Sequence, residues 1–250
     1  MGTIVILGSA NAVPDQYHEN THLLIQEGDR AVLVDCTGNP IAELNRTGVS
    51  PDALTDIILT HFHPDHVSGV PLLLMDLWLL GRRKSITIHG LADTVTRMKS
   101  MMDLYDWRDW PNFFSILYHP LPEEDQVAVL RDEDFAITAS PVKHLIPTLG
   151  IRVEFQRTGK VMAFSSDTEP CQSVIDLAQQ ADLLIHEATG SSFGHSLPRQ
   201  AGEVAQMAGA KTLSLIHYPT NADSEKWLRE AKEAFDGPVS LATDYQRTEI

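Results

Sequence analysis

Short apolar runs alternate with polar, turn-forming segments along the whole chain. Compact runs rich in Val, Ile and Leu are typical of buried strands, and longer segments with apolar residues three or four positions apart are typical of amphipathic helices. Strand and helix alternate in the last third, which favours two sheets with helices packed outside them. The pattern predicts strands at 3–8, 21–26, 31–35, 56–60, 86–89, 126–130, 134–139, 151–156, 160–164, 182–186 and 212–216, and helices at 68–80, 92–104, 171–179, 198–208 and 223–235.

Proline and glycine mark the ends of the last two predicted helices. Pro198 stands in the first turn of its helix, where a missing N–H costs nothing. Gly209 and Gly237 follow the two helices, where a C-terminal cap requires a left-handed residue.

The run from His61 to His66 reads His-Phe-His-Pro-Asp-His and directly follows the apolar run 57–60. Residues two apart on an extended segment point the same way, so His61 and His63 are expected to reach one metal ion together. Asp65 and His66 follow as the chain turns, and are placed to reach a second ion. Imidazoles and a carboxylate suit zinc, with manganese, iron or cobalt as alternatives.

Three further polar residues close apolar runs elsewhere in the chain. His144 follows the run 138–143, Asp167 follows 161–166, and His217 follows 212–216. Each one alone has a structural explanation, as a core histidine or a capping aspartate. Because functional side chains gather where strands end, the three together are candidate ligands for the same site. Asp35, at the end of the predicted strand 31–35, is expected to have a structural role in a turn.

The ligand order His-x-His-x-Asp-His, followed by His144, Asp167 and His217, resembles that of the two-metal hydrolases of the metallo-β-lactamase fold. The resemblance narrows to the ribonuclease Z and small phosphodiesterase branch. Residues 186–189 read His-Glu-Ala-Thr, and residues 194–197 read Gly-His-Ser-Leu, similar to that branch's His-Ser-Thr motif. Ser166 stands where the branch has Gly in Ser-Gly-Asp-Thr, and Leu197 stands where it has Thr.

The resemblance implies a single domain over residues 1–250, with the fold of a four-layer αβ/βα sandwich and a homodimeric assembly. It also implies two divalent ions per chain, which activate a bridging water as hydroxide and clamp the oxygens of a displacement at phosphorus. By the same resemblance Asp167 bridges the two ions, and Asp65 also orients the hydroxide. The implied ligands are His61, His63 and His144 for the first ion, and Asp65, His66 and His217 for the second.

A leaving alkoxide needs a proton, and His195 is the candidate general acid. Glu187 is its candidate partner, since a carboxylate holds an imidazole ring and raises its basicity. His186 lies inside an apolar strand. It could therefore be a core histidine or a residue that supports the metal ligands from outside.

Two features favour a small phosphodiester, such as a cyclic nucleotide or a short RNA end, over transfer RNA. The ribonucleases of the branch carry a long flexible arm, usually between the positions that match His144 and Asp167. Only 23 positions (167 − 144) separate those residues here, which leaves room for two strands. The net charge of −15 is unlike the basic surface that nucleic acid binding requires.

Other functions stay open from the sequence. These are a transfer RNA 3′-end endoribonuclease, and a lactone, thioester or sulfate-ester hydrolase of the same fold. His63 disfavours a di-iron redox protein, because those proteins typically carry Glu at this position. The aromatic residues of segment 105–114 fit a pocket wall or base-stacking surface, and fit equally a packed loop or dimer interface.

The composition also bears on the cellular compartment of the protein. The chain has two cysteines, too few for a disulfide framework, and it opens with an apolar strand in place of a signal peptide. The apolar run 70–80 is too short to cross a bilayer. We therefore expect a cytoplasmic protein without a membrane partner.

Overall fold

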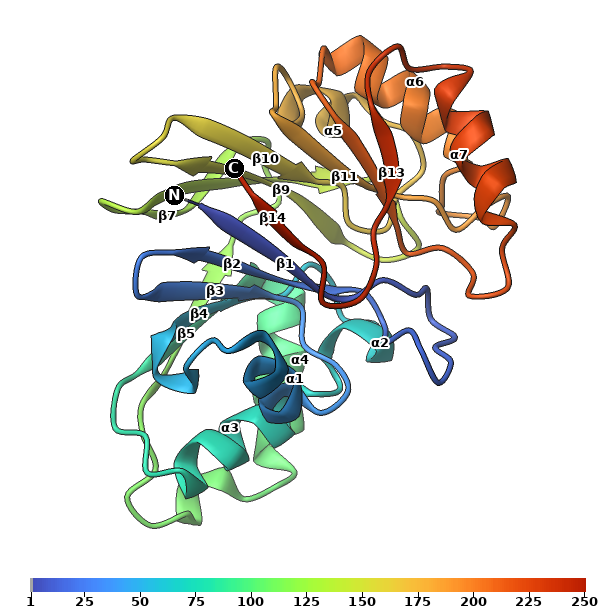
Figure 1. Cartoon of the computed structure of the whole chain (residues 1–250). Helices are drawn as coiled ribbons and strands as arrows, with labels where there is room; N and C mark the ends of the chain where they lie inside the picture. Colours follow the sequence, from blue (N-terminus) through green and yellow to red (C-terminus); the bar gives the residue numbers. More distant parts are fainter. Residues whose placement is uncertain (1) are drawn as a thin grey trace.

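Two seven-stranded sheets pack face to face in the computed structural model, which describes residues 2–250 (Figure 1). The first sheet has the order β14-β1-β2-β3-β4-β5-β6, and the second has the order β13-β12-β11-β10-β9-β8-β7. The strands of the first sheet are β1 (Thr3–Gly8), β2 (His22–Glu27), β3 (Arg30–Val34), β4 (Leu54–Ile58), β5 (Ile86–Leu91), β6 (Ile116–Leu121) and β14 (Arg247–Glu249). Those of the second are β7 (Val127–Arg131), β8 (Phe135–Val142), β9 (Thr148–Phe155), β10 (Lys160–Phe164), β11 (Leu183–Glu187), β12 (Leu213–Ile216) and β13 (Val239–Leu241).

Helices cover the outer face of each sheet, which gives the four layers that the sequence predicts (Figure 1). On the first sheet lie α1 (Pro40–Thr47), α3 (Val70–Leu79) and α4 (Ala92–Asp103). On the second lie α5 (Gln172–Leu177), α6 (Pro198–Ala208) and α7 (Ser224–Lys232). The short helix α2 (Pro64–Val67) lies on the first sheet's side of the molecule, beyond the ends of its strands at the right of Figure 1. No helix within residues 2–250 is long and apolar enough to cross a membrane.

Side-chain alternation divides the apolar residues among three cores. Along β2, Leu23 and Ile25 point into the core between the sheets, and Leu24 points to the helices. Phe135 and Phe155 meet edge to face in the central core, with ring centroids 5.8 Å apart. A strand buried on both faces reads as a continuous apolar run, which is why the sequence shows these strands clearly.

A buried polar network joins neighbouring strands between the sheets. Arg30 Nη2 donates to Asp56 Oδ2 at 2.8 Å, and His89 Nε2 lies 2.8 Å from Asp56 Oδ1. Arg30 also pairs with Asp132. Burial raises the pKa of Asp56, but hydrogen bonds from His89, Thr55 and Arg30 outweigh it and bring the pKa down to about 2.

Five of the elements named above are not predicted from the sequence: α1, α2, β6, β13 and β14. Strand β6 lies at a sheet edge and is largely exposed, so its apolar residues do not form a buried run. Strand β14 consists of three polar residues and exists through its pairing with β1. These elements are set by tertiary contacts and carry little local signal.

The helix-end predictions for α6 and α7 have different outcomes. Pro198 opens α6, and Gly209 caps it in the left-handed region at φ 64°, as predicted. The prediction for Gly237 is wrong. Helix α7 ends at Lys232 with Glu233 in right-handed conformation, and Gly237 has no positive φ. Glycine is needed at 237 for space, because a Cβ there would lie 2.4 Å from the ring of Phe235.

Candidate metal centre

The run 61–66 lies just beyond the carboxyl end of β4, where the chain turns into α2. His61 and His66 are fully buried. His63 is the N-cap residue of α2, and Pro64 occupies the first helical position, where its fixed φ suits a helix start. The turn therefore presents two histidines before the helix and an Asp-His pair in the helix's first turn.

Other strands end at the same edge. His144 follows β8, Asp167 follows β10 and His217 follows β12. Strands β10, β11 and β12 are parallel, and β8 runs in the same direction as β10 because both pair antiparallel with β9. Their carboxyl ends therefore meet at one edge, the usual place for a ligand site in such sheets.

The first three predicted ligands converge. His61 Nε2 lies 3.0 Å from His63 Nδ1, and His63 Nδ1 lies 3.3 Å from His144 Nε2. The second three also converge, with Asp65 Oδ2 3.6 Å from His66 Nε2 and 3.8 Å from His217 Nε2.

Asp167 lies between the two groups. Its Oδ2 atom is 3.4 Å from His217 Nε2, 3.5 Å from His66 Nε2 and 3.9 Å from Nε2 of both His61 and His144. Most of these separations are too long for good hydrogen bonds. Two ligands at tetrahedral angles on one zinc ion would lie about 3.4 Å apart.

Buried atoms without partners support a metal at this position. Among the described residues, His66 Nε2, His217 Nε2 and Asp167 Oδ1 are buried and have no hydrogen-bond partner. Unpaired buried polar atoms are costly, and a cation coordinated by them removes that cost. The residues present therefore fit divalent cations.

In four of the histidines, a contact at Nδ1 orients the ring so that Nε2 points into the metal centre. Four histidines keep Nδ1 against an oxygen acceptor, which fixes the tautomer with a free Nε2 lone pair. The contacts are His61 Nδ1 to Thr60 Oγ1 at 3.0 Å, His66 Nδ1 to Asp35 Oδ2 at 2.8 Å, His144 Nδ1 to the Gly194 carbonyl at 2.8 Å and His217 Nδ1 to Thr189 Oγ1 at 2.8 Å.

Asp35 has a larger part in this arrangement than the sequence indicates. It adopts φ 61°, in keeping with the predicted turn. Its buried carboxylate also accepts from the Thr60 N–H and hydroxyl at 2.8 Å each, besides contacting His66. An aspartate closing a buried strand is the signal in the sequence, but its partners are 25 and 31 positions away.

His195 and Glu187 form a pair beside the centre, as the sequence predicts. His195 Nδ1 lies 3.0 Å from Glu187 Oε1, and the His195 ring stacks on the His217 ring with centroids 5.7 Å apart. Glu187 is buried at the end of β11 and also accepts from the backbone N–H groups of Thr168, Thr189 and Ser196. The ring of His195 is thus fixed by a carboxylate that is itself fixed.

Electrostatics at the site follow from burial and opposite charges. Burial lowers the pKa of His61 well below its ordinary value. Burial also lowers the pKa of His195, but the hydrogen bond and charge of Glu187 outweigh it and raise that pKa overall. Burial raises the pKa of Asp167, yet His217 and His66 bring it well below its usual range, so this carboxylate is ionised.

Other histidines stay outside the cluster. His22 Nε2 pairs with buried Glu43 Oε2 at 2.7 Å. His186 is buried, and its Nδ1 donates to the Glu187 carbonyl at 2.7 Å. Neither belongs to the groups of potential ligand atoms that the described residues form.

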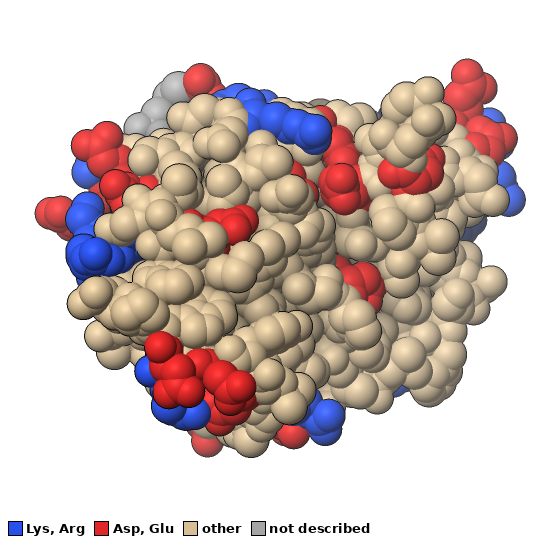
Figure 2. Space-filling view, turned by 90° about the horizontal axis from the view of Figure 1, so that it is seen from below, with Lys and Arg blue, Asp and Glu red and all other residues tan. Residues whose placement is uncertain are grey.

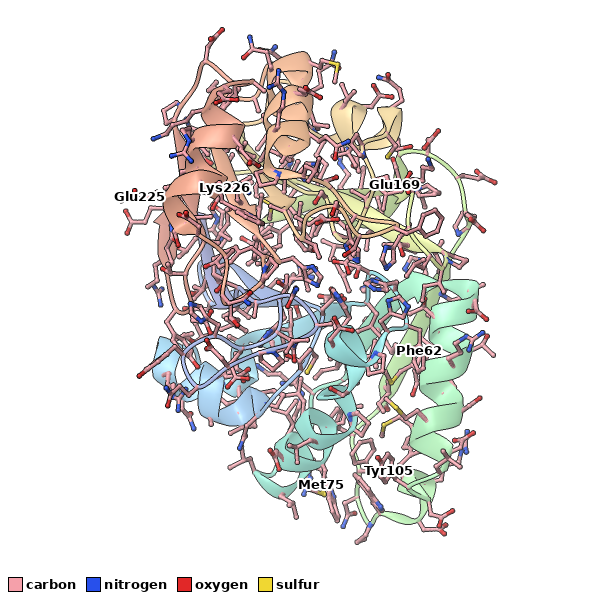
Figure 3. All side chains as sticks on the ribbon, turned by 90° about the vertical axis from the view of Figure 1, so that its right-hand side faces the viewer. Phe62, Met75, Tyr105, Glu169, Glu225 and Lys226 are labelled. Carbon is pink, nitrogen blue, oxygen red and sulfur yellow. The ribbon has the colours of Figure 1, made fainter. Side chains whose placement is uncertain are left out.

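A cavity of about 430 Å³ opens beside His195. Glu169, Ser192, Phe193 and Leu197 line it, and the Phe193 side chain is 77% exposed. No lysine or arginine is among its lining residues. In Figure 3, Glu169 lies in the half of the molecule that contains the second sheet, and Phe62 lies in the half that contains the first. Both are on the same side of the molecule.

The aromatic segment 105–114 lies elsewhere. It precedes β6 and so stands at the amino ends of the parallel strands β4, β5 and β6, whereas the metal centre stands at their carboxyl ends. Trp110 stacks on Trp78 of α3 with centroids 5.1 Å apart, and Trp78 Nε1 donates to the Pro111 carbonyl. The segment is therefore packed on α3 and does not form a wall of the metal centre.

The fold and site match a known family. The family described as "Beta-lactamase superfamily domain" matches residues 30–218. Ribonuclease Z of Methanothermobacter thermautotrophicus is 27% identical over 305 aligned positions, covering 100% of this chain and 97% of that protein. Ribonuclease Z of Mycobacterium sp. (strain KMS) is 29% identical, covering 99% of this chain and 95% of that protein.

The alignment with the archaeal protein also shows a difference in length. It spans 305 positions, whereas this chain has 250 residues, so about 55 residues (305 − 250) of the relative have no counterpart here. Between His144 and Asp167 the structure holds only β9, β10 and their turns. The expectation that this chain lacks a long arm there is confirmed.

Solved structures share the fold. The short form of human tRNase Z has a TM-score of 0.82 at 24% identity, covering 99% of both chains. A diphosphatase from the PhnP family has a TM-score of 0.78 at 17% identity, covering 100% of this chain and 98% of that one. With the family match over residues 30–218, the chain belongs to the metallo-β-lactamase superfamily and is a hydrolase of that fold.

Proposed function

We propose that this hydrolase is a phosphodiesterase with a binuclear, zinc-type centre that cleaves small phosphodiesters, such as a cyclic nucleotide or a short RNA end. The single observation that carries the proposal is the convergence of two ligand triads on Asp167, beside the pair formed by His195 and Glu187. His61, His63 and His144 would hold one ion, and Asp65, His66 and His217 the other, with Asp167 between them.

When bound, the ions would supply positive charge for the phosphoryl oxygens and lower the pKa of a water that attacks phosphorus. The residues of the chain do the rest. Asp65 accepts a hydrogen bond from that water and orients it. As the new P–O bond forms, the bond to the leaving oxygen breaks, and His195 Nε2 gives its proton to that oxygen. Glu187 holds Nδ1 of the same ring and stabilises the protonated imidazole.

The preference for a small substrate rests on charge and length. The net charge is −15, and the cavity beside His195 has no lysine or arginine among its lining residues. Proteins that bind a nucleic acid strand instead need cationic groups that follow its phosphate backbone. The relatives named ribonuclease Z favour a second candidate, cleavage at the 3′ end of a transfer RNA precursor.

Parallel assays of different substrates under the same conditions distinguish the two candidate functions. Purified protein is assayed with bis-p-nitrophenyl phosphate, cyclic nucleotides and a transfer RNA precursor. The proposal predicts turnover of the small diesters with weak cleavage of the precursor. Efficient endonucleolytic cleavage of the precursor would replace it with the second candidate. Hydrolysis of acyl or sulfate esters alone would move the function to another class of hydrolase.

We also propose that the protein is a homodimer in the cytoplasm. Leu79, Leu80, Leu104 and Tyr105 are exposed apolar residues near the end of α3 and the segment after α4. Figure 2 shows a face with a large uncharged area in its middle, with charged groups toward its edges and a cluster of both signs at the lower left. Exposed apolar patches often mark interfaces. Sedimentation velocity with a Leu104→Asp variant tests this, and a monomeric wild type would contradict it.

A further inference from the structure

One charged contact at the mouth of the site is used by neither the metal centre nor the proton donor. Lys143 Nζ lies 2.5 Å from Glu169 Oε2, where β8 and the segment after Asp167 run side by side. The Lys143 side chain is 66% exposed and that of Glu169 is 23% exposed. Glu169 lines the cavity beside His195. The carboxylate therefore lies in the wall of this cavity, and the ammonium group that pairs with it is exposed to solvent.

Glu169 is also fixed relative to the centre. Its Oε1 atom accepts from the Gly194 N–H at 3.3 Å, and the Gly194 carbonyl accepts from His144 Nδ1 at 2.8 Å. Two hydrogen bonds thus connect the carboxylate to a candidate ligand. A Cβ on Gly194 would lie 3.0 Å from His144 Nδ1, so the backbone of this loop packs closely against the candidate ligand.

Both members of the pair are charged at neutral pH. Lysine and glutamate carry full charges at neutral pH at their ordinary pKa values, and the 2.5 Å contact pairs these charges. Lys143 directly precedes His144, so it is the cation next to the centre in the chain. A lysine at that position would otherwise offer a flanking phosphate a positive partner. Exposed ion pairs contribute little to stability, so removing the charge of Glu169 is expected to leave the fold intact.

We propose that Glu169 is a specificity-determining residue that selects against polyanionic strands. It pairs with Lys143 and cancels its positive charge, so a phosphodiester with flanking phosphates finds no free cation beside the cavity, while a small diester needs none. This inference rests on the phosphodiesterase function proposed above and deepens it, since it names the residue that limits substrate size.

Glu169→Gln tests the inference, because the amide keeps an oxygen acceptor for the Gly194 N–H while it removes the charge. Binding of a fluorescein-labelled short single-stranded RNA is measured by anisotropy over a salt series. We expect tighter binding by the variant and a plot of log affinity against log salt steeper by about 0.7, the value for one added phosphate contact on a single strand. Lys143→Ala in the Glu169→Gln background is expected to remove the gain.

The matched control is Glu230→Gln. Glu230 pairs with Lys226 at 3.8 Å on α7, so the variant changes the net charge equally, and Figure 3 shows Lys226 on the opposite side of the molecule from Glu169. An unchanged salt slope in Glu169→Gln, or an equal change in Glu230→Gln, would overturn the inference.

Turnover distinguishes this failure from failure of the proposed function. We expect the ratio of kcat/KM for RNA to kcat/KM for bis-p-nitrophenyl phosphate to rise in Glu169→Gln. If the wild type cleaves the small diester and neither the ratio nor the slope changes, only the role of Glu169 is wrong. If the wild type does not cleave it but the slope steepens, the proposed function is wrong and the exclusion of polyanions by Glu169 stands.

Discussion

His195 Nδ1 lies 3.0 Å from Glu187 Oε1, and this buried carboxylate accepts three backbone N–H groups besides the imidazole. The carboxylate cannot turn away from the ring without losing those hydrogen bonds. The ring therefore presents Nε2 to the centre in one orientation, stacked on His217. A held imidazole of raised pKa is suited to donate a proton at neutral pH.

Removal of the imidazole tests its role as the acid. His195→Ala is expected to lower kcat by roughly 10²–10⁴-fold, because no other group donates the proton. Metal content measured by elemental analysis is expected to stay near that of the wild type. A wild-type turnover rate in this variant would exclude His195 from the mechanism.

The dependence of kcat/KM on pH tests whether Glu187 is the partner of His195. Since the pKa of His195 is raised and the acid must be protonated, kcat/KM is expected to fall as pH rises through that pKa. Glu187→Gln removes the charge that raises it, so the fall is expected to begin at lower pH. The profile is measured with bis-p-nitrophenyl phosphate, and an unmoved alkaline limb would refute the pairing.

Asp167→Ala tests the position between the triads. Asp167 Oδ2 lies 3.4–3.9 Å from four histidine Nε2 atoms, so its loss is expected to reduce the metal bound per chain. Asp93→Ala, an exposed aspartate on α4, is the control. The metal retained after dialysis reports the outcome, and wild-type stoichiometry in Asp167→Ala would sink the bridging assignment.

Phe193 lines the cavity with an exposed ring, which suits stacking against a nucleobase. Phe193→Ala is expected to raise KM about tenfold for a p-nitrophenyl ester of a nucleoside monophosphate and to leave kcat unchanged, since stacking contributes about 1–3 kcal/mol per base. Met207→Ala removes another exposed apolar side chain, on α6, and is the control. Equal KM values for wild type and Phe193→Ala would show that the ring does not contact substrate.

The network around Asp56 predicts a stability that depends on pH. Its folded pKa of about 2 lies below the ordinary 3.8, so its contribution is full above the unfolded pKa and is lost as pH falls toward 2. Asp56→Asn is expected to cost about 2 kcal/mol at neutral pH. Urea unfolding of metal-free proteins measures the difference, and a cost that does not shrink below about pH 4 would contradict this account.

Much of the fold is visible in the sequence because strands such as β3 and β11 are buried on both faces and read as apolar runs. Strand β14 is not visible, since its residues are polar and its partner lies at the other end of the chain. The prediction extends helix α7 too far, because residues 233–235 continue its pattern of apolar and polar positions. In the structure the helix ends at Lys232.

At the site, the polar residues that close strands could be predicted because each stands after an apolar run. The contacts that orient them could not. Asp35 holds His66 across 31 positions, and the Gly194 carbonyl holds His144 across 50. Such partners are brought together by sheet order, and a backbone carbonyl carries no signature in the sequence.

We propose that the two triads hold two divalent ions that serve phosphodiester hydrolysis. The most direct measurement is elemental analysis of the purified protein together with hydrolysis of bis-p-nitrophenyl phosphate by the same preparation, before and after chelation. The account predicts two zinc-type ions per chain, loss of both metal and cleavage with the chelator, and recovery of both on adding metal back. Full cleavage by metal-free protein, or two bound ions with turnover only of acyl or sulfate esters, would contradict it.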